Sequence, residues 1–351
     1  MNRWARGQRG TERTWNSFCY LHELKKHPKP FVAMPHRFKN RCYPLARHDV
    51  MQFPDEESIR NDVARDCGDI IDLAKRVLSS WMTVGRSHGY TKSALPPEVI
   101  NAAYVLDVRA CRQFRSVVEL CMRGEAHDAS ILTRTMFENL LALEFVLKPR
   151  ISLKPYKNRY KSKAPSSMSR LLRARLYLTY FGFQWEVLKS RNSKKARANR
   201  RARQLASQVP KQVRDHYESL IGSVWVERFK QHPRTYSGLT VSELAQAIGP
   251  VYAIWYNVVY AIQSGDVHAS NAAELLHFSE AIWHDMPCRV ERTLRAATDM
   301  FLAGADSLHK NIGFGSAARM LLSGLDDQYR RIKEKRRNRE WQQRDCRDNA
   351  S

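Results

Sequence analysis

The sequence lacks long hydrophobic runs. Its 351 residues contain no stretch of about 18 apolar residues, the length that a transmembrane helix needs. The N-terminal residues carry positive charge but not the apolar centre of a secretory signal. The seven cysteines are scattered and odd in number, which is typical of reduced thiols rather than of a disulfide framework. We therefore predict a cytoplasmic protein that does not associate with membranes.

Familiar catalytic and cofactor-binding signatures are also missing. The sequence has no GxxxxGK[S/T] phosphate loop, no HExxH zinc motif, and no kinase, hydrolase or dinucleotide signature. Cys19, His22, Cys42 and His48 are suitable residue types for zinc, but their spacing is loose, and an ordinary basic arm is the favoured interpretation. We predict neither a bound metal nor a cofactor.

Acidic residues are scarce relative to basic ones. The chain has 35 Asp and Glu against 59 Lys and Arg, a formal net charge of +24. Such an excess indicates a polyanionic partner: RNA, DNA or an acidic membrane surface. The basic segments lack the Trp- and Leu-rich face of a membrane-surface helix, so a nucleic-acid backbone is the expected partner.

Most of this excess lies in one segment. Residues 148–214 contain 20 Lys or Arg and a single acid, Glu186, so they carry +19 of the +24. Solvated faces normally mix both signs, and we therefore predict phosphate contacts here. The predicted nucleic-acid-binding residues are Lys189, Arg191, Lys194, Lys195, Arg197, Arg200, Arg201 and Arg203. Seven interleaved aromatic residues can stack on unpaired bases, although at least half are expected to pack locally: Tyr156, Tyr160, Tyr177, Tyr180, Phe181, Phe183 and Trp185.

No alternating strand pattern occurs, and apolar residues recur at helical spacing, so the fold class is all-α. The expected helices span about 55–81, 98–123, 126–147, 211–230, 241–263, 269–310 and 315–333. Residues 169–188 are expected to be ordered and packed, and 189–204 to be a solvated helix or a disordered insert. Gly124 and Pro149 mark the ends of the second and third helices. We divide the chain into a basic, proline-containing N-terminal arm (1–54), a helical bundle (55–327) with a basic insertion (148–214), and a basic C-terminal tail (328–351).

Two polar segments interrupt the apolar pattern. In "SILTRTMFENLLALEF", Arg134 and Glu138 lie four residues apart and share a helical face. They fit either an ion pair at the edge of the core or a buried pair that shapes a polar site. In "YAIQSGDVHAS", Tyr260, Ser264 and His268 follow at intervals of four. Capping of a new helix explains Ser264 but not His268, which is either structural or catalytic.

Together the two segments resemble an uncharacterised family of helical bacterial proteins, over about 98–310. Members pair an R-[ST]-x-x-E segment with a later Tyr and an S-x-x-V-H segment, which here correspond to Arg134, Thr135, Glu138, Tyr260, Ser264, Val267 and His268. That family resembles the wider HEPN superfamily (higher eukaryotes and prokaryotes nucleotide-binding). Many HEPN proteins are metal-independent endoribonucleases of toxin or phage-defence systems, and many are dimers.

The resemblance implies a HEPN-like bundle, an RNA substrate, a homodimer and an antitoxin or other defence-system partner. In the implied reaction His268 transfers protons and Arg134 stabilises charge on the phosphorane. Glu138 orients Arg134, and Tyr260 or Ser264 holds the phosphate. No arginine lies four to six residues before His268, where the nuclease motif has one, so the arginine must come from elsewhere in the fold, such as Arg134. The alternative is a non-catalytic module that binds nucleic acid or protein, with a purely structural Arg/Glu/His cluster.

Overall fold

The computed structural model describes residues 56–88, 90, 93–192, 211–231, 235–257 and 286–348. Within these ranges the regular structure is entirely helical, with no strand, which confirms the all-α class. The predicted N-terminal arm (1–54) lies outside the described residues.

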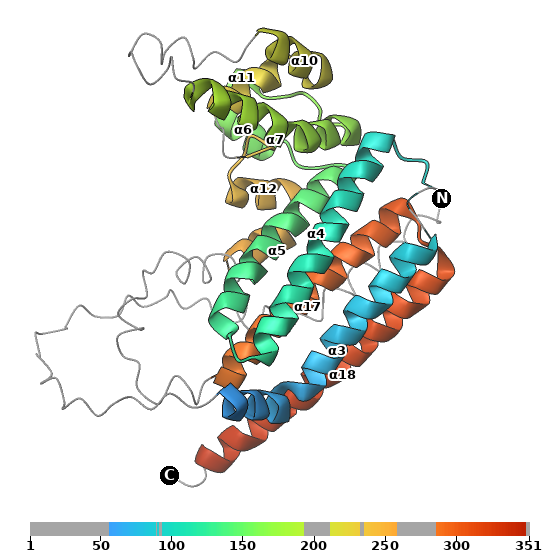
Figure 1. Cartoon of the computed structure of the whole chain (residues 1–351), viewed down its shortest axis with the longest axis vertical. Coiled ribbons are helices and arrows are strands. Elements are labelled where there is room, and N and C mark those ends of the chain that lie inside the picture. Colours follow the sequence, from blue (N-terminus) through green and yellow to red (C-terminus); the bar gives the residue numbers. More distant parts are fainter. Residues whose placement is uncertain are drawn as a thin grey trace, which may run out of the picture. The chain divides into compact units, whose positions relative to one another are not determined.

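Four long helices form the core: α3 (Glu56–His88), α4 (Pro97–Met122), α5 (Ala126–Leu147) and α17 (Met286–Ile312). Helix α17 packs against the other three, and α4 also contacts α3 and α5 (Figure 1). The interior holds rings from several helices, including a T-shaped Trp81–Phe314 pair and a stacked Phe114–Phe301 pair. This packing fixes α5, which carries the predicted catalytic arginine and glutamate.

The turn between α4 and α5 follows directly from the sequence. Gly124 has a φ of 80°, a left-handed conformation that glycine adopts at little cost. Its N–H donates to the carbonyl of Cys121, and the Glu125 N–H donates to that of Leu120, which together make a Schellman motif. The predicted helices 98–123 and 126–147 are confirmed, and the tight turn makes them antiparallel neighbours.

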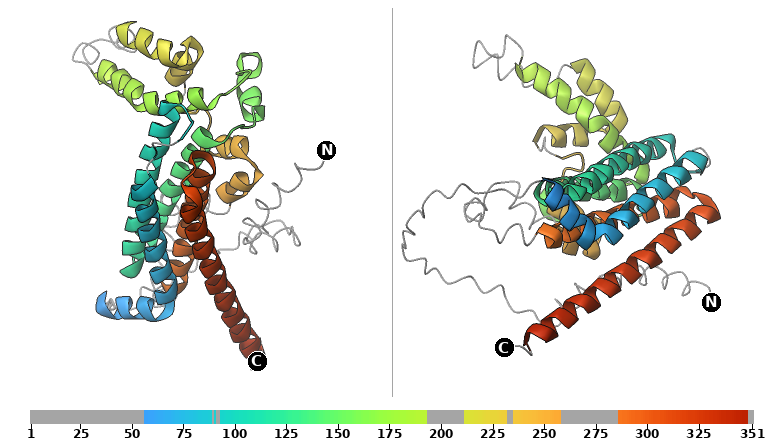
Figure 2. Two further views of the ribbon diagram at one scale, coloured as in Figure 1. Left: turned by 90° about the vertical axis from the view of Figure 1, so that its right-hand side faces the viewer. Right: turned by 60° about the horizontal axis from the view of Figure 1, so that its bottom comes forward.

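The described part of the basic segment packs on one end of this bundle. It comprises α6 (Lys154–Tyr160), the short 3-10 helix η2 (Lys161–Lys163) and α7 (Arg170–Asn192). Figures 1 and 2 show α6 and α7 where α4 begins and α5 ends, together with α10 (Lys211–Ile221) and α11 (Ser223–Gln231). Helix α7 contacts α4, α5, α10 and α11, so it is an integral packed element.

Two predicted helices are wrong in their continuity. The prediction of one helix over 211–230 fails because Gly222, with a φ of 87°, separates α10 from α11. The prediction of one helix over 241–263 fails because Gly249 and Pro250 separate α12 (Val241–Ile248) from α13 (Pro250–Trp255). Proline has no N–H to continue the helical ladder, so it begins a new helix instead.

The last helix, α18 (Gly315–Asp348), is longer than the predicted 315–333. Its first part belongs to the compact unit Glu56–Ile332, where Tyr329 donates its hydroxyl hydrogen to the carbonyl of Arg295 at 2.9 Å. A second unit begins at Lys333, and α18 continues into it as a helix.

Candidate functional site

Arg134 and Glu138 lie one turn apart on α5, at the edge of the bundle core. Arg134 Nε is 3.8 Å from Glu138 Oε1, and the two side chains are 17% and 45% exposed. A partly exposed pair at this spacing contributes about 0.3–0.5 kcal/mol. The geometry is therefore that of an ion pair at the edge of the core, open to solvent on the glutamate side.

The remaining predicted catalytic residues lie outside the described residues: Tyr260, Ser264 and His268. The described part of the chain before them ends at residue 257. Trp255, the last residue of α13, has its ring centroid 6.4 Å from that of Phe137, and Phe137 lies next to Glu138 on α5. Helix α13 therefore contacts the predicted catalytic helix α5.

Direct hydrogen bonds tie α5 to α4 beside the ion pair. Gln113 Nε2 donates to Thr135 Oγ1 at 3.0 Å, and Asn139 Nδ2 donates to the carbonyl of Leu106 at 2.9 Å. Thr135 is the [ST] position of the R-[ST]-x-x-E segment. Because its hydroxyl accepts the hydrogen bond from Gln113, it has a structural role in the pairing of α4 and α5. These bonds fix the rotation of α5 about its own axis and thereby the direction of the Arg134 and Glu138 side chains.

A buried carboxylate lies at the centre of a second polar network, one that the sequence analysis did not anticipate. Asp107 on α4 accepts hydrogen bonds from Trp81 Nε1 at 2.8 Å and from Tyr90 Oη at 2.6 Å. Burial raises the pKa of Asp107, and the bonds from Tyr90, Trp81 and Cys111 act against that rise. Burial, with the nearby Asp107 charge, also raises the pKa of the Cys111 thiol to about 12. The thiol is therefore unsuited to act as a nucleophile.

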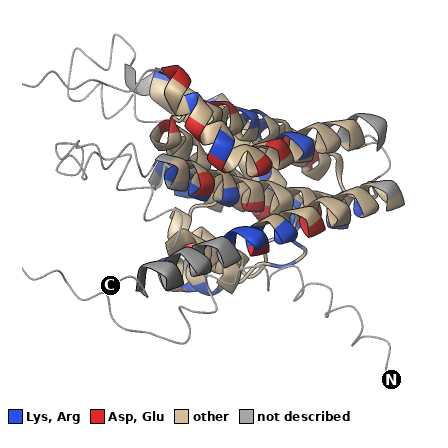
Figure 3. Cartoon of the chain, turned by 90° about the horizontal axis from the view of Figure 1, so that it is seen from below, with Lys and Arg blue, Asp and Glu red and all other residues tan. Residues whose placement is uncertain are grey.

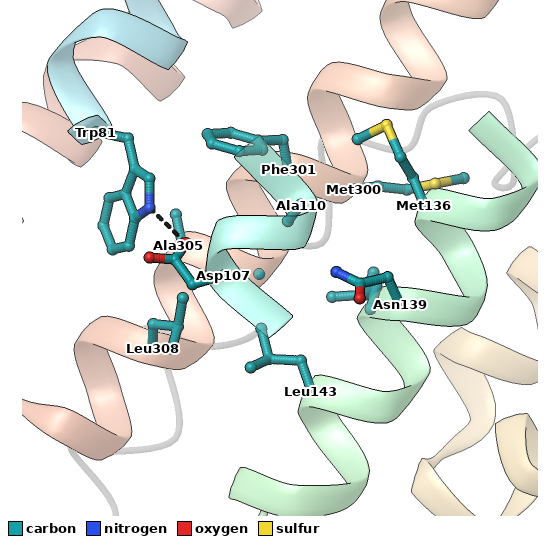
Figure 4. A pocket seen from close by; sticks show the side chains of 12 residues that line it. Trp81, Asp107, Ala110, Met136, Asn139, Leu143, Met300, Phe301, Ala305 and Leu308 are labelled. Atoms are coloured by element: carbon teal, nitrogen blue, oxygen red, sulfur yellow. Dashed lines mark hydrogen bonds between the residues drawn. The ribbon is translucent and has the colours of Figure 1, made fainter. Parts of the chain in front are cut away.

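The Asp107 network borders a small cavity between α3, α4, α5 and α17 (Figure 4). The cavity has a volume of about 20 Å³ for the centre of a water-sized sphere, which is room for about one water molecule. Asn139 also lines it, and within the described part of the chain its Oδ1 has no hydrogen-bond partner. The cavity is too small for a nucleotide or a metabolite, so it is a packing feature and not a substrate pocket.

A third polar cluster lies further along α5. Glu144 is 7% exposed and accepts hydrogen bonds from the hydroxyls of Tyr252 and Ser307. Burial raises the pKa of Glu144, while Lys148, one turn away, acts to lower it. The Lys148 ammonium donates to the carbonyl of Ile248 at 2.5 Å, at the C-terminal end of α12. This cluster joins α5, α12, α13 and α17 and explains the acidic residue within the apolar run "LLALEFVL".

Several arginines of the basic segment act as structural anchors. Arg159 pairs with Glu243 of α12 at 2.5 Å, and Arg175 pairs with Glu98 of α4 at 2.9 Å. Arg173 is fully buried, donates to the carbonyl of Lys148, and lies over the ring of Phe145. Burial lowers its pKa to about 10. These guanidinium groups hold α6 and α7 on the bundle, so only part of the +19 charge faces solvent.

Four lysines of the same segment are exposed instead: Lys154, Lys157, Lys161 and Lys189. Among the predicted nucleic-acid-binding residues, Lys189 is described on α7, and its ammonium lies 2.9 Å from Glu186 Oε1. Arg191 falls in the last turn of α7. The other six lie outside the described residues: Lys194, Lys195, Arg197, Arg200, Arg201 and Arg203.

The seven aromatic residues of the segment separate into two groups. Four are buried, as expected for at least half of them: Tyr156, Tyr177, Tyr180 and Phe183. Tyr160 is half-buried and donates to the carbonyl of Gly238. Phe181 and Trp185 are 61% and 59% exposed, so two rings of the seven face solvent broadly.

Charge on the rest of the molecule is mixed. Seen from below, Lys and Arg alternate with Asp and Glu along the described helices (Figure 3). Within the described ranges no cluster of three His, Cys, Asp or Glu is placed to hold a metal ion, and no helix is long and apolar enough to cross a membrane. Cys19, His22, Cys42 and His48 lie outside those ranges.

Comparison with known proteins places this geometry in a family. Residues 101–281 match DUF5677, a family of unknown function. The chain belongs to this family. The DUF5677 region begins on α4 and includes α5, the basic segment and the segment with His268. The expectation of an uncharacterised family is thus confirmed, over a shorter span than the expected 98–310. No curated protein and no solved structure matches the chain significantly.

Proposed function

We propose that this DUF5677 protein binds RNA through segment 148–214. The supporting observation is that some basic residues of this segment hold its helices on the bundle, whereas others are exposed to solvent. Arginines such as Arg159, Arg173 and Arg175 anchor the helices, while four lysines are exposed: Lys154, Lys157, Lys161 and Lys189. Exposed cations that outnumber acids attract a phosphate backbone, and their binding releases counterions.

The salt dependence of RNA affinity tests this proposal. For single strands, each phosphate contact contributes about −0.7 to the slope of log K against log salt concentration. The variant to compare replaces six residues with Gln: Lys194, Lys195, Arg197, Arg200, Arg201 and Arg203. Losing all six contacts flattens the slope by about 4.

A matched control removes the same charge from the second basic run. It replaces Arg330, Arg331, Lys333, Lys335, Arg337 and Arg339 with Gln, and leaves the buried Arg336 in place. We expect its slope to stay close to that of the unmodified protein. An unchanged slope in the first variant, or an equal loss in the control, contradicts binding through 148–214.

A second candidate activity, RNA cleavage without a metal, is supported by the Arg134–Glu138 pair, which is open to solvent on the glutamate side. In this reaction His268 removes the proton from a ribose 2′-hydroxyl, and the 2′-oxygen attacks the adjacent phosphorus. The bond from phosphorus to the 5′-oxygen breaks, and water protonates the leaving oxygen. The products are a 2′,3′-cyclic phosphate and a 5′-hydroxyl. Arg134 stabilises the phosphorane, and Tyr260 or Ser264 holds the phosphate.

Cleavage is tested with end-labelled RNA in the presence of a chelator. We expect His268→Ala and Arg134→Gln to abolish product while RNA affinity and thermal stability stay close to those of the unmodified protein. Glu138→Gln is expected to slow the reaction less, because it removes only the group that orients Arg134. Absence of any cleavage by the unmodified protein favours the non-catalytic module, in which these residues are structural. A toxin or defence role, with an antitoxin partner and a homodimer, belongs to the catalytic form of the proposal.

A further inference from the structure

Helix α7 has one face that is firmly packed. Tyr180 meets Phe229 of α11 in a T-shaped contact with centroids 5.3 Å apart, and Phe183 meets Tyr217 of α10 at 5.4 Å. Val187 continues this buried side, at 3% exposure. The helix is thus held in a fixed rotation, which determines what it presents to solvent.

The solvent side of α7 carries a continuous apolar stripe. Leu178, Phe181, Trp185 and Leu188 are 38%, 61%, 59% and 47% exposed. Their spacings of three, four and three residues put them on one side of a helix. Single exposed apolar residues are ordinary, whereas a contiguous set of four marks an interaction surface.

The charge around this stripe indicates what binds there. Between residues 170 and 192 the helix has five basic residues and one acid, Glu186. Lys189 lies 5.7 Å from the Trp185 ring centroid, so a cation stands beside the exposed indole. A second copy of α7 would bring like charges together and lose energy. A polyanion with apolar flat faces matches both the rings and the cations.

We propose that Phe181 and Trp185 form a stacking platform for unpaired bases of a single-stranded nucleic acid, with Lys189 at the adjoining phosphate. The proposal rests on the proposed RNA binding and specifies its form. Both rings are more than half exposed, and residues one turn apart on a helix can each take a separate base. Bases in a duplex are covered by their neighbours on both faces, so the platform selects single strands.

The test compares one single strand with one duplex. Labelled oligouridine of about 16 nucleotides and an RNA duplex of equal length are titrated against the full chain at one salt concentration. The variants are Phe181→Leu, Trp185→Leu and the double change, which keep apolar area but remove the rings. The control is Leu188→Ala, which trims the same stripe without touching a ring.

We expect the unmodified protein to prefer the single strand. Each ring removed should weaken oligouridine binding at least about fivefold, the factor that corresponds to about 1 kcal/mol per stacked base. Duplex affinity and the salt slope should stay unchanged, as should the melting temperature, because both rings are exposed. The Leu188→Ala control should bind as the unmodified protein does.

Three results overturn the platform alone. The first is oligouridine affinity that is unchanged in the double variant. The second is a loss in Leu188→Ala as large as in the double variant, which means that the apolar area of the stripe, and not the rings, holds the strand. A protein that binds RNA with the expected salt slope but without preference for single strands also excludes the platform and leaves the proposed function standing. A protein that binds neither nucleic acid contradicts both.

Discussion

Replacing Asp107 should destabilise the bundle in a way that depends on both the substituent and the pH. Asp107→Leu leaves two buried donors, Trp81 Nε1 and the Tyr90 hydroxyl, without their acceptor. Each unsatisfied buried donor costs about 1–3 kcal/mol, so we expect a loss of about 2–6 kcal/mol in the free energy of unfolding. Asp107→Asn keeps one acceptor oxygen and should cost less.

The pH dependence follows from the raised pKa of Asp107, whose ordinary value is 3.8. Between the ordinary and the raised pKa, the folded state binds more protons than the unfolded state. The free energy of unfolding therefore falls as pH rises through that window. Asn carries no such proton, so the penalty of Asp107→Asn should be largest at or below the ordinary pKa of 3.8, shrink as pH rises through the window, and level off above the folded pKa.

Urea unfolding of the two variants and the unmodified protein at several pH values measures both effects. Tyr90→Phe serves as a companion variant, because it removes one donor and leaves the carboxylate. A loss below about 1 kcal/mol for Asp107→Leu would mean that the network is not buried as described. A difference between Asp107→Asn and the unmodified protein that does not change with pH would refute the raised pKa.

Three further outcomes are expected. Gly304→Ala should raise the free energy of unfolding by about 1 kcal/mol through helix propensity. It should give a further gain by filling the cavity, because the new methyl meets Leu143 and Leu140 at 3.5 and 3.7 Å. At Gly324 an added methyl meets nothing within 4 Å, so Gly324→Ala measures the helix-propensity effect without any cavity filling. Thermal melts compare the stability gains of the two variants. Thr240→Ala removes the capping box of α12 and should cost about 1 kcal/mol in urea unfolding, and no loss would contradict the cap. Light scattering should give about twice the chain mass of 40.8 kDa. A sample that contains only the 40.8 kDa species at micromolar concentration would exclude the dimer.

Proline and glycine residues at their ends made α4 and α5 predictable from sequence. Pro97 suits the first turn of a helix, Gly124 suits its end, and Pro149 stops the next one. Gly222 and Gly249 also end helices, but apolar periodicity continues on both sides of each break and predicts one continuous helix. Periodicity alone cannot separate one long helix from two short ones that pack on the same surface.

The candidate site was harder to predict, because its partners come from distant parts of the chain. Asp107 and Glu144 are acids in apolar runs, which signals a buried polar role. Their donors lie on other helices or loops, and no local pattern identifies them: Trp81, Tyr90, Tyr252 and Ser307. Likewise, a charge count from sequence includes every arginine, whereas in the folded protein Arg173 is buried and Arg175 pairs with Glu98.

Photocrosslinking tests the central claim most directly. Single-stranded RNA that carries photoreactive thiouridine is bound to the full chain and irradiated, and the crosslinked peptides are identified by mass spectrometry. The account predicts crosslinks on α7 at Phe181 or Trp185 and in the basic run that ends at Arg203. Crosslinks confined to residues 1–54 or 330–340, with none between 178 and 203, would contradict it.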